Sequence, residues 1–200
     1  MIKLGITGGI GSGKSVICKI LESFGVPVFR ADEEGRKLLA CDSSVQNRVI
    51  RLLGKEILTG DKPDTRKIAA IVFSNPDKLA ALNGIIHPAV RESFIKWSEQ
   101  FAHSPCVAEE AAILFESGGA KLLDYTILVT APEEVRITRT MQRDNISEEE
   151  VKRRMKYQWS DEEKKKHADF VITNDENNAL IPQVIAILGK LKINIGKTNS

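Results

Sequence analysis

A chain of 200 residues is long enough for one sizeable hydrophobic core, with room for a small inserted subdomain. The 29 Lys and Arg residues nearly balance the 27 Asp and Glu residues, so a net charge of +2 argues against binding to nucleic acid through a general basic field. No apolar run approaches the roughly 20 residues that a membrane-spanning helix needs, and we identify no signal peptide. We therefore expect a cytoplasmic protein with neither a membrane nor a nucleic-acid partner. Its cysteines, Cys18, Cys41 and Cys106, share no metal-binding spacing, which indicates reduced thiols.

Five short apolar runs bounded by turn residues predict the strands. In chain order they are Ile2–Thr7, Val26–Phe29, Cys106–Glu109, Thr126–Thr130 and Phe170–Thr173. Longer segments with helical periodicity separate them, and several carry start signals: Asn75-Pro76 and the capping boxes that begin at Thr130, Ser147 and Ser160. Strands separated by helices are typical of a parallel sheet with helices on both faces. We therefore predict an α/β fold with a five-stranded parallel sheet.

Two of the intervals between strands are too long for a single crossover helix. About 75 residues separate the second and third strands. We interpret residues 36–101 as a helical substrate-binding insert, with helices predicted at Arg66–Phe73, Asp77–Asn83 and Pro88–Phe101. Residues 136–166 are dense in charge, and we interpret them as an arginine-rich lid because three arginines share one helix face at i, i+3 and i+7: Arg136, Arg139 and Arg143. The core of the domain is then predicted to consist of residues 1–35, 102–135 and 167–195.

The stretch from Gly8 to Ser15 reads GGIGSGKS and matches the phosphate-binding loop G-x-x-x-x-G-K-[ST]. It lies between the strand Ile2–Thr7 and a helix predicted at Val16–Phe24. Its four glycines are expected to permit positive φ, so that backbone N–H groups converge on phosphate oxygens. Lys14 is expected to reach the β- and γ-phosphates, and the Ser15 hydroxyl to bind Mg²⁺. The loop predicts nucleotide binding without identifying the reaction.

An acid after the second strand, the insert and the arginine-rich lid together favour a small-molecule kinase. Asp32 lies at the carboxyl edge of the predicted sheet, where a carboxylate can accept the proton of an attacking hydroxyl. It could equally be the N-cap of a helix at Glu33–Ala40. Glu109-Glu110 at the end of the third strand weakens the interpretation as a motor or transporter ATPase, and no guanine-reading N-K-x-D sequence occurs. A kinase for another small metabolite and a nucleotide-dependent switch protein stay open as alternatives.

Beyond these motifs, the sequence resembles the dephospho-coenzyme A kinase family over nearly its whole length. The resemblance lies in GITGGIGSGKS near the start, AD at 31–32, LNGIIHP at 82–88, ILFESG at 113–118, the R-x-x-x-R-D run at 139–144 and Gln158. It implies one P-loop kinase domain over residues 1–200 that phosphorylates the ribose 3′-hydroxyl of dephospho-CoA, the last step of coenzyme A synthesis. ATP and dephospho-CoA would be its ligands and Mg²⁺ its cofactor. We expect a monomer or a weak homo-oligomer.

The resemblance also implies roles for individual residues. Asp32 would be the catalytic base, assisted by Lys14 and Arg139, while His87 and Glu116 would contact the acceptor. The predicted ATP-binding residues are Gly9, Gly11, Ser12, Gly13, Lys14, Ser15, Val16, Arg143 and Asn174.

Simpler interpretations of three of these residues stay open. His87 could merely start a helix at Pro88, because a residue before proline disfavours helical φ and ψ. Glu116 could orient a neighbouring arginine or lysine, and Asn174 could form a turn.

Two positions depart from the family pattern. The family usually has D-A-D where this chain has Arg30-Ala31-Asp32, so a base replaces the first acid. The segment that usually reads P-L-L-F-E begins here with Ala112 and Ile113. Asp32 keeps the place of the second acid, whereas Arg30 puts the family's substrate contacts at this edge in doubt.

Overall fold

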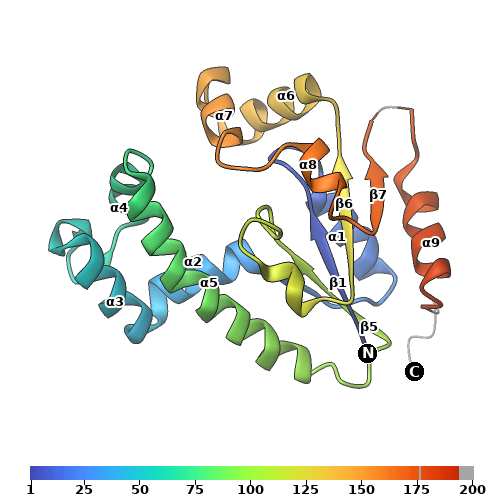
Figure 1. Ribbon diagram of the computed structural model, residues 1–200, viewed down its shortest axis with the longest axis horizontal. Coiled ribbons are helices and arrows are strands. Elements are labelled where there is room, and N and C mark those ends of the chain that lie inside the picture. The colour runs from blue at the N-terminus through green and yellow to red at the C-terminus, as the bar shows by residue number, and fades with distance from the viewer. Residues whose placement is uncertain (176, 194–200) are drawn as a thin grey trace. The chain divides into compact units, whose positions relative to one another are not determined.

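Figure 1 shows the computed structural model of the chain, which describes residues 1–175 and 177–193. The chain forms two compact units: one contains Met1–Arg30 and the chain from Ser98 onward, and the other contains Ala31–Trp97. The insert predicted at 36–101 lies largely in the second unit. The lid predicted at 136–166 lies in the first.

The first unit is built on a five-stranded parallel sheet, as predicted. Its strands are β1 (Ile2–Thr7), β2 (Val28–Arg30), β5 (Cys106–Glu110), β6 (Tyr125–Thr130) and β7 (Phe170–Thr173). Their order across the sheet is β2-β5-β1-β6-β7, and every neighbouring pair is parallel. The chain leaves the central strand β1 for the edge strand β2 and later returns to fill both sides of β1. The carboxyl end of β1 therefore lies at the point where the strand order reverses, which is the usual ligand-binding position in such sheets.

Helices cover this sheet and extend beyond its carboxyl edge. They are α1 (Lys14–Ser23), η2 (Gly119–Leu122), α6 (Glu133–Asp144), α7 (Glu148–Met155), α8 (Asp161–Lys165) and α9 (Leu180–Lys190). α1 and α9 pack together on one face, α8 packs against β6 on the other, and α6 follows the carboxyl end of β6 (Figure 1). The core between these layers is apolar and includes the free cysteines Cys18 and Cys106, both with no exposed surface. The expectation of buried, reduced thiols at these two positions is confirmed.

Three of the four predicted helix starts are confirmed. The Ser147 hydroxyl accepts a hydrogen bond from Glu150 N at 3.3 Å at the start of α7, and the Ser160 hydroxyl accepts one from Glu163 N at 3.1 Å at the start of α8. Asn75 accepts one from Lys78 N at 3.0 Å. The capping box at Thr130 is wrong, because Thr130 is the last residue of β6 and α6 begins only at Glu133.

The second unit is mainly helical and has its own core. It contains α2 (Ala31–Cys41), α3 (Ser43–Leu53), η1 (Lys55–Ile57), α4 (Thr65–Val72) and most of α5 (Pro76–Glu99). One cluster of buried apolar side chains in it consists of Leu39, Val45, Val49, Leu53, Ile57, Ile68 and Val72. A small antiparallel hairpin of β3 (Leu58–Thr59) and β4 (Lys62–Pro63) was not predicted.

The helices predicted at Asp77–Asn83 and Pro88–Phe101 are one continuous helix, α5, which runs through Pro88. A proline inside a helix removes one backbone hydrogen bond and costs about 3 kcal/mol. Here the carbonyl that loses its partner belongs to Gly84, which is exposed to solvent. Val90 and Phe94 are buried beyond the proline, and burial of each such side chain stabilises the fold by about 1.5–3 kcal/mol. Packing therefore outweighs the local preference to end the helix.

Candidate active site

The predicted phosphate-binding loop joins β1 to α1 at the centre of the first unit. Gly11 and Gly13 have φ of 76° and 95°, in the left-handed region that favours glycine. A Cβ at Gly11 would overlap the carbonyl oxygen of Arg136, and one at Gly13 would overlap the Asn174 amide. Gly9, in contrast, has no positive φ, so the expected conformational freedom is not used there. Gly9 must be small for another reason: the Arg136 guanidinium occupies the space that a Cβ would take.

The loop presents unused backbone donors. Within residues 1–175 and 177–193, the N–H groups of Gly11 and Gly13 have no hydrogen-bond partner. The first N–H groups of α1 also lack partners inside the helix, as at any helix start, and the positive end of the helix dipole lies there. Such a convergence of donors is suited to a phosphate group. Lys14 and Ser15 are the first two residues of α1 and share this position.

Lys14 lies against the loop backbone. Its ammonium group donates to Gly8 O at 2.9 Å and to Gly9 O at 3.4 Å, and the residue is only 9% exposed. These bonds hold the charge beside the loop donors. Ser15 and Val16, next in the helix, are exposed.

Asn174, predicted to bind ATP, contacts the loop directly. The residue is buried just after β7, and its side-chain amide donates to Ser12 O at 2.8 Å. Its backbone N–H donates to Thr130 O at 2.7 Å, and its carbonyl accepts a hydrogen bond from Arg139 at 3.4 Å. Asn174 therefore joins the ends of β6 and β7 to the loop, which a simple turn would not do.

The three arginines predicted to share one lid face have different surroundings. Arg136 is buried against the loop and forms an ion pair of 3.2 Å with Asp161. Arg139 is half-buried next to Asn174. Arg143 is exposed and binds Asp144 through two hydrogen bonds, which lower the pKa of that carboxyl. The common spacing therefore predicts the helix but not a common role.

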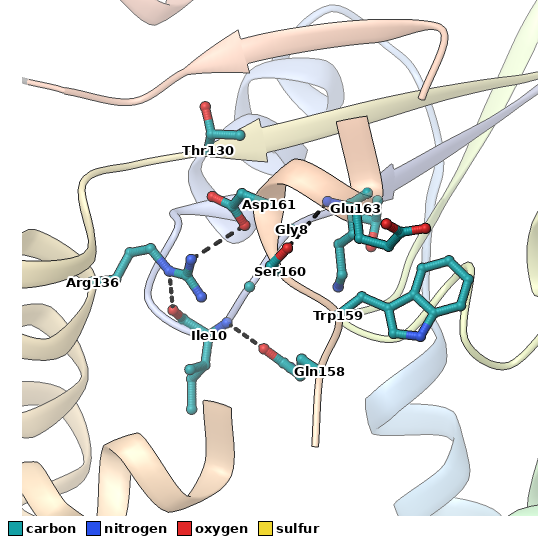
Figure 2. Close-up of polar contacts among 12 residues, drawn as sticks. Gly8, Ile10, Thr130, Arg136, Gln158, Trp159, Ser160, Asp161 and Glu163 are labelled. Atoms are coloured by element: carbon teal, nitrogen blue, oxygen red, sulfur yellow. Dashed lines mark hydrogen bonds and ion pairs between the residues drawn. The ribbon is translucent and has the colours of Figure 1, made fainter. Parts of the chain in front are cut away.

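Figure 2 shows two side chains that hold the tip of the loop at Ile10. Arg136 Nε donates to Ile10 O at 3.0 Å, and Ile10 N donates to the Gln158 side-chain oxygen at 2.9 Å. Gln158 lies between α7 and α8. No role in the site was predicted for Gln158 from the sequence, where its signal was its place in the family resemblance.

A buried ion pair lies beside this segment. Lys164 of α8 has no exposed surface, and its ammonium donates to Ala112 O at 2.6 Å and lies 3.1 Å from Glu116 Oε1. Burial lowers the pKa of Lys164, although the Glu116 charge opposes the shift. Glu116 Oε1 also accepts a hydrogen bond from Trp159 N at 2.9 Å. The interpretation that Glu116 orients a neighbouring lysine is confirmed, whereas Lys164 itself was missed.

In the second unit, Asp32 and His87 are close enough to interact electrostatically. Asp32 is exposed in the first turn of α2, which begins at Ala31, so the alternative of an N-cap for a helix at 33–40 is wrong. Gly35, one turn later, packs against Ile86 of α5. The pKa of His87 is lowered by burial and by Arg91, and Asp32 opposes this shift. His87 lies inside α5, so it does not start a helix.

Arg30, which replaces the usual acid, lies at the end of β2 and pairs with Glu22 of α1 at 2.7 Å. Both side chains are about one-third exposed. The base at this position is therefore compensated within the first unit.

A cavity of about 720 Å³ lies beside Arg136 and Gln158. It is lined by the lid helices and by the ends of β6 and β7, including Thr173 and Asp175, but by no residue of the loop Gly8–Ser15. The phosphate-facing side of the loop therefore lies outside this cavity.

The described residues contain neither a cluster that could hold a metal ion nor a helix that could span a membrane. Among residues 1–175 and 177–193, no group of three or more His, Cys, Asp and Glu side chains could hold a metal ion. In the same part of the chain, no helix is long and apolar enough to cross a membrane.

Comparison with known proteins gives consistent matches. A family model described as dephospho-CoA kinase matches residues 2–179. A protein of Bacteroides fragilis named dephospho-CoA kinase is 44% identical over 193 residues, which cover 95% of this chain and 93% of that protein. A crystal structure from Thermus thermophilus has a TM-score of 0.84 at 36% identity and covers 95% of this chain and 97% of its own. A dephospho-CoA kinase from Campylobacter jejuni has a TM-score of 0.68 at 27% identity, with 94% and 96% covered.

The same fold also occurs in a kinase with much lower sequence identity to this chain. Shikimate kinase from Acinetobacter baumannii has a TM-score of 0.54 at 14% identity and covers 96% of this chain and 93% of its own. At that identity the likeness shows the fold alone, which is that of P-loop kinases.

Proposed function

The chain belongs to the dephospho-CoA kinase family, and from this premise we propose that it transfers the γ-phosphoryl group of ATP to the ribose 3′-hydroxyl of dephospho-CoA. The product is coenzyme A, and ADP is released. The observation that carries the proposal is the loop Gly8–Ser15, with Lys14 beside backbone donors that have no partner in the described part of the chain.

The donor half of the reaction is assigned to the first unit. The N–H groups of Gly11 and Gly13 and the start of α1 bind the phosphates of ATP, and Lys14 neutralises their charge. Asn174 and Arg139 hold the loop side on which the nucleotide lies. Arg143 reaches ATP only if it leaves Asp144, because the two are joined by a bidentate hydrogen bond.

Mg²⁺ is proposed to enter with ATP. The exposed Ser15 hydroxyl at the loop end would be its protein ligand, and the remaining ligands would be phosphate oxygens and water. A magnesium ion bound in this way neutralises the developing charge on the phosphates.

The acceptor half is assigned to the second unit. The 3′-hydroxyl oxygen attacks the γ-phosphorus, the bond from that phosphorus to the bridging oxygen breaks, and the hydroxyl proton passes to the Asp32 carboxylate. Because its pKa is lowered, His87 is neutral near pH 7 and can contact the acceptor through hydrogen bonds. Arg91 would supply positive charge for the acceptor's pyrophosphate, while Glu116 acts through Lys164 and Trp159.

Release of ADP from Mg·ATP across a panel of acceptors tests this function. Dephospho-CoA should stimulate ADP release, whereas shikimate, gluconate and nucleoside monophosphates should not. Stimulation by one of the other acceptors instead would assign the protein to a different small-metabolite kinase. Stimulation by none of them would favour a nucleotide-dependent switch.

Asp32→Asn tests the assignment of the base. Loss of a general base lowers the rate by about 10²–10⁴-fold, so kcat should fall by that factor while ATP affinity stays unchanged. Glu33→Gln is the matched control, because Glu33 is the exposed neighbour in the same helical turn. If Asp32→Asn retains near-normal turnover, Asp32 is not the base.

We further propose that the protein works in the cytoplasm as a monomer or weak homo-oligomer. Its free cysteines suit a reducing compartment, where ATP is also supplied. Light scattering across a range of protein concentrations measures the assembly state.

A further inference from the structure

The geometry points to Gln158 as a positioning residue for nucleotide binding, because it forms one half of a clamp on the Ile10 peptide groups. In this clamp, the Gln158 side-chain oxygen accepts from Ile10 N at 2.9 Å and Arg136 Nε donates to Ile10 O at 3.0 Å (Figure 2). Both backbone polar groups of Ile10 are thereby fixed by side chains from the lid segment. The inference rests on nucleotide binding at this loop and not on the identity of the acceptor.

The clamped residue lies where the chain is least constrained. Gly8, Gly9 and Gly11 surround Ile10, so it is the only residue of the run 8–11 with a side chain. Glycine samples more backbone conformations than any other residue, and ordering it costs more entropy. Without the clamp, the loop would lose this entropy when the phosphates bind. With it, the loop is already ordered, and preorganisation of this kind raises affinity.

The clamp also determines which donors face the nucleotide. Gln158 uses the Ile10 N–H. The N–H groups of Gly11 and Gly13 have no partner among residues 1–175 and 177–193, and they remain for the phosphates. The Gly11 N–H belongs to the same planar peptide group as the Ile10 carbonyl, which Arg136 holds. The clamp therefore fixes the direction of this donor.

Both arms of the clamp are themselves held in place. Arg136 is 7% exposed and forms an ion pair of 3.2 Å with Asp161. On the other side, the residue after Gln158 donates through Trp159 N to Glu116 at 2.9 Å, and the next, Ser160, caps α8. Gln158 therefore belongs to a fixed segment, and its oxygen does not need to be ordered when the nucleotide arrives.

Calorimetric titration with ADP tests this role without any catalytic turnover. Gln158→Met keeps the length of the side chain but removes the acceptor. It should weaken ADP binding by about 2- to 12-fold, the factor for loss of one neutral hydrogen bond. The Kd for dephospho-CoA should change little, and the thermal midpoint should fall by about 1–6 °C, the shift expected for loss of one hydrogen bond. Gln142→Met is the matched control, because it makes the same change at an exposed position of α6.

Rescue by a conservative variant separates positioning from bulk packing. Gln158→Glu retains an acceptor oxygen and should recover most of the ADP affinity when all variants are compared at raised salt, where the added charge is screened. Equal losses in Gln158→Met and Gln158→Glu would contradict a role of the acceptor oxygen. ADP binding by Gln158→Met at the wild-type Kd would overturn the clamp. Absence of ADP binding by the wild-type protein would instead overturn the proposed function.

Hydrogen exchange of the wild-type protein provides a test that needs no variant. In the nucleotide-free protein, the Ile10 amide should exchange slowly because it is bonded to Gln158, whereas the Gly11 amide should exchange fast. An Ile10 amide that exchanges as fast as that of Gly11 would also overturn the clamp.

Discussion

Replacement of Lys164 by methionine removes one partner of the buried ion pair while keeping a side chain of similar length. Lys164 has no exposed surface and lies 3.1 Å from Glu116 Oε1, whose side chain is 13% exposed. The substitution also leaves Ala112 O without its 2.6 Å donor. Loss of one member of a buried pair costs about 3–5 kcal/mol, because the other charge stays buried without compensation.

This cost is large enough to measure. For a chain of this size, each kcal/mol shifts the thermal midpoint by about 2–4 °C, so Lys164→Met should lower it by about 6–20 °C. Urea denaturation followed by circular dichroism and by tryptophan fluorescence gives the free energy of unfolding and tests whether there is a single transition. In the double variant with Glu116→Gln, part of the loss should be recovered, with a coupling energy of about 0.5–3 kcal/mol.

The pH dependence of stability has a definite sign for this pair. Burial lowers the pKa of Lys164 below its ordinary value of 10.5, so the unfolded chain binds more protons than the native protein between the two values. Stability contributed by this group therefore rises with pH in that window, and Lys164→Met should remove the rise.

Lys152→Met is the control for this experiment, because Lys152 pairs with Glu148 while both side chains are about half exposed. An exposed pair contributes little to stability. If Lys164→Met is no more destabilising than Lys152→Met, the reasoning about the buried pair is refuted.

Two further predictions concern the loop and the cysteines. Lys14→Ala should weaken ATP binding and lower kcat together, because its ammonium group lies beside the loop donors that are proposed to bind the phosphates; unchanged ADP production would contradict the loop assignment. Burial raises the pKa of Cys18 and Cys106 from 9.0 to about 12, so the unfolded chain releases these protons first and stability should fall as pH rises from about 9 towards 12. Cys18→Ala should reduce that fall in urea denaturation between about pH 8 and 10.5, and an unchanged slope would show that the thiol is not buried as described.

The sheet was predictable because its strands are short apolar runs and the central strand β1 is largely buried. Ile2–Thr7 and Phe170–Thr173 are short apolar runs between turn residues, and the structure has the same bounds. Such runs are typical of a covered parallel sheet. The hairpin of Leu58–Thr59 and Lys62–Pro63 has only two residues in each strand, too few for any periodicity. Pro88 misled the helix prediction, because a local penalty was offset by packing contacts that periodicity alone does not weigh.

The candidate site also contains both residues that a local motif predicts and residues that only long-range contacts reveal. Lys14 and Ser15 were found because the loop motif is local and its chemistry follows from spacing. Gln158 binds a residue 148 positions away, and Lys164 binds Ala112 at a separation of 52, so no local pattern marks either of them. A buried lysine also looks like a solvated one in a charge-rich segment. Only the fold brings these side chains to their partners.

The close fit of the loop glycines increases the number of positions at which a mutation could inactivate the protein. A motif search inspects only positions 8–15, yet those glycines fit against walls formed by Val129, Arg136, Thr140 and Asn174. A bulkier side chain at Thr140 or Asn174, whose side-chain atoms form part of these walls, would press on the loop while leaving the motif intact. Sequence variants of this protein should therefore be assessed at the walls as well as at the glycines, since an unbroken motif does not guarantee an open phosphate site.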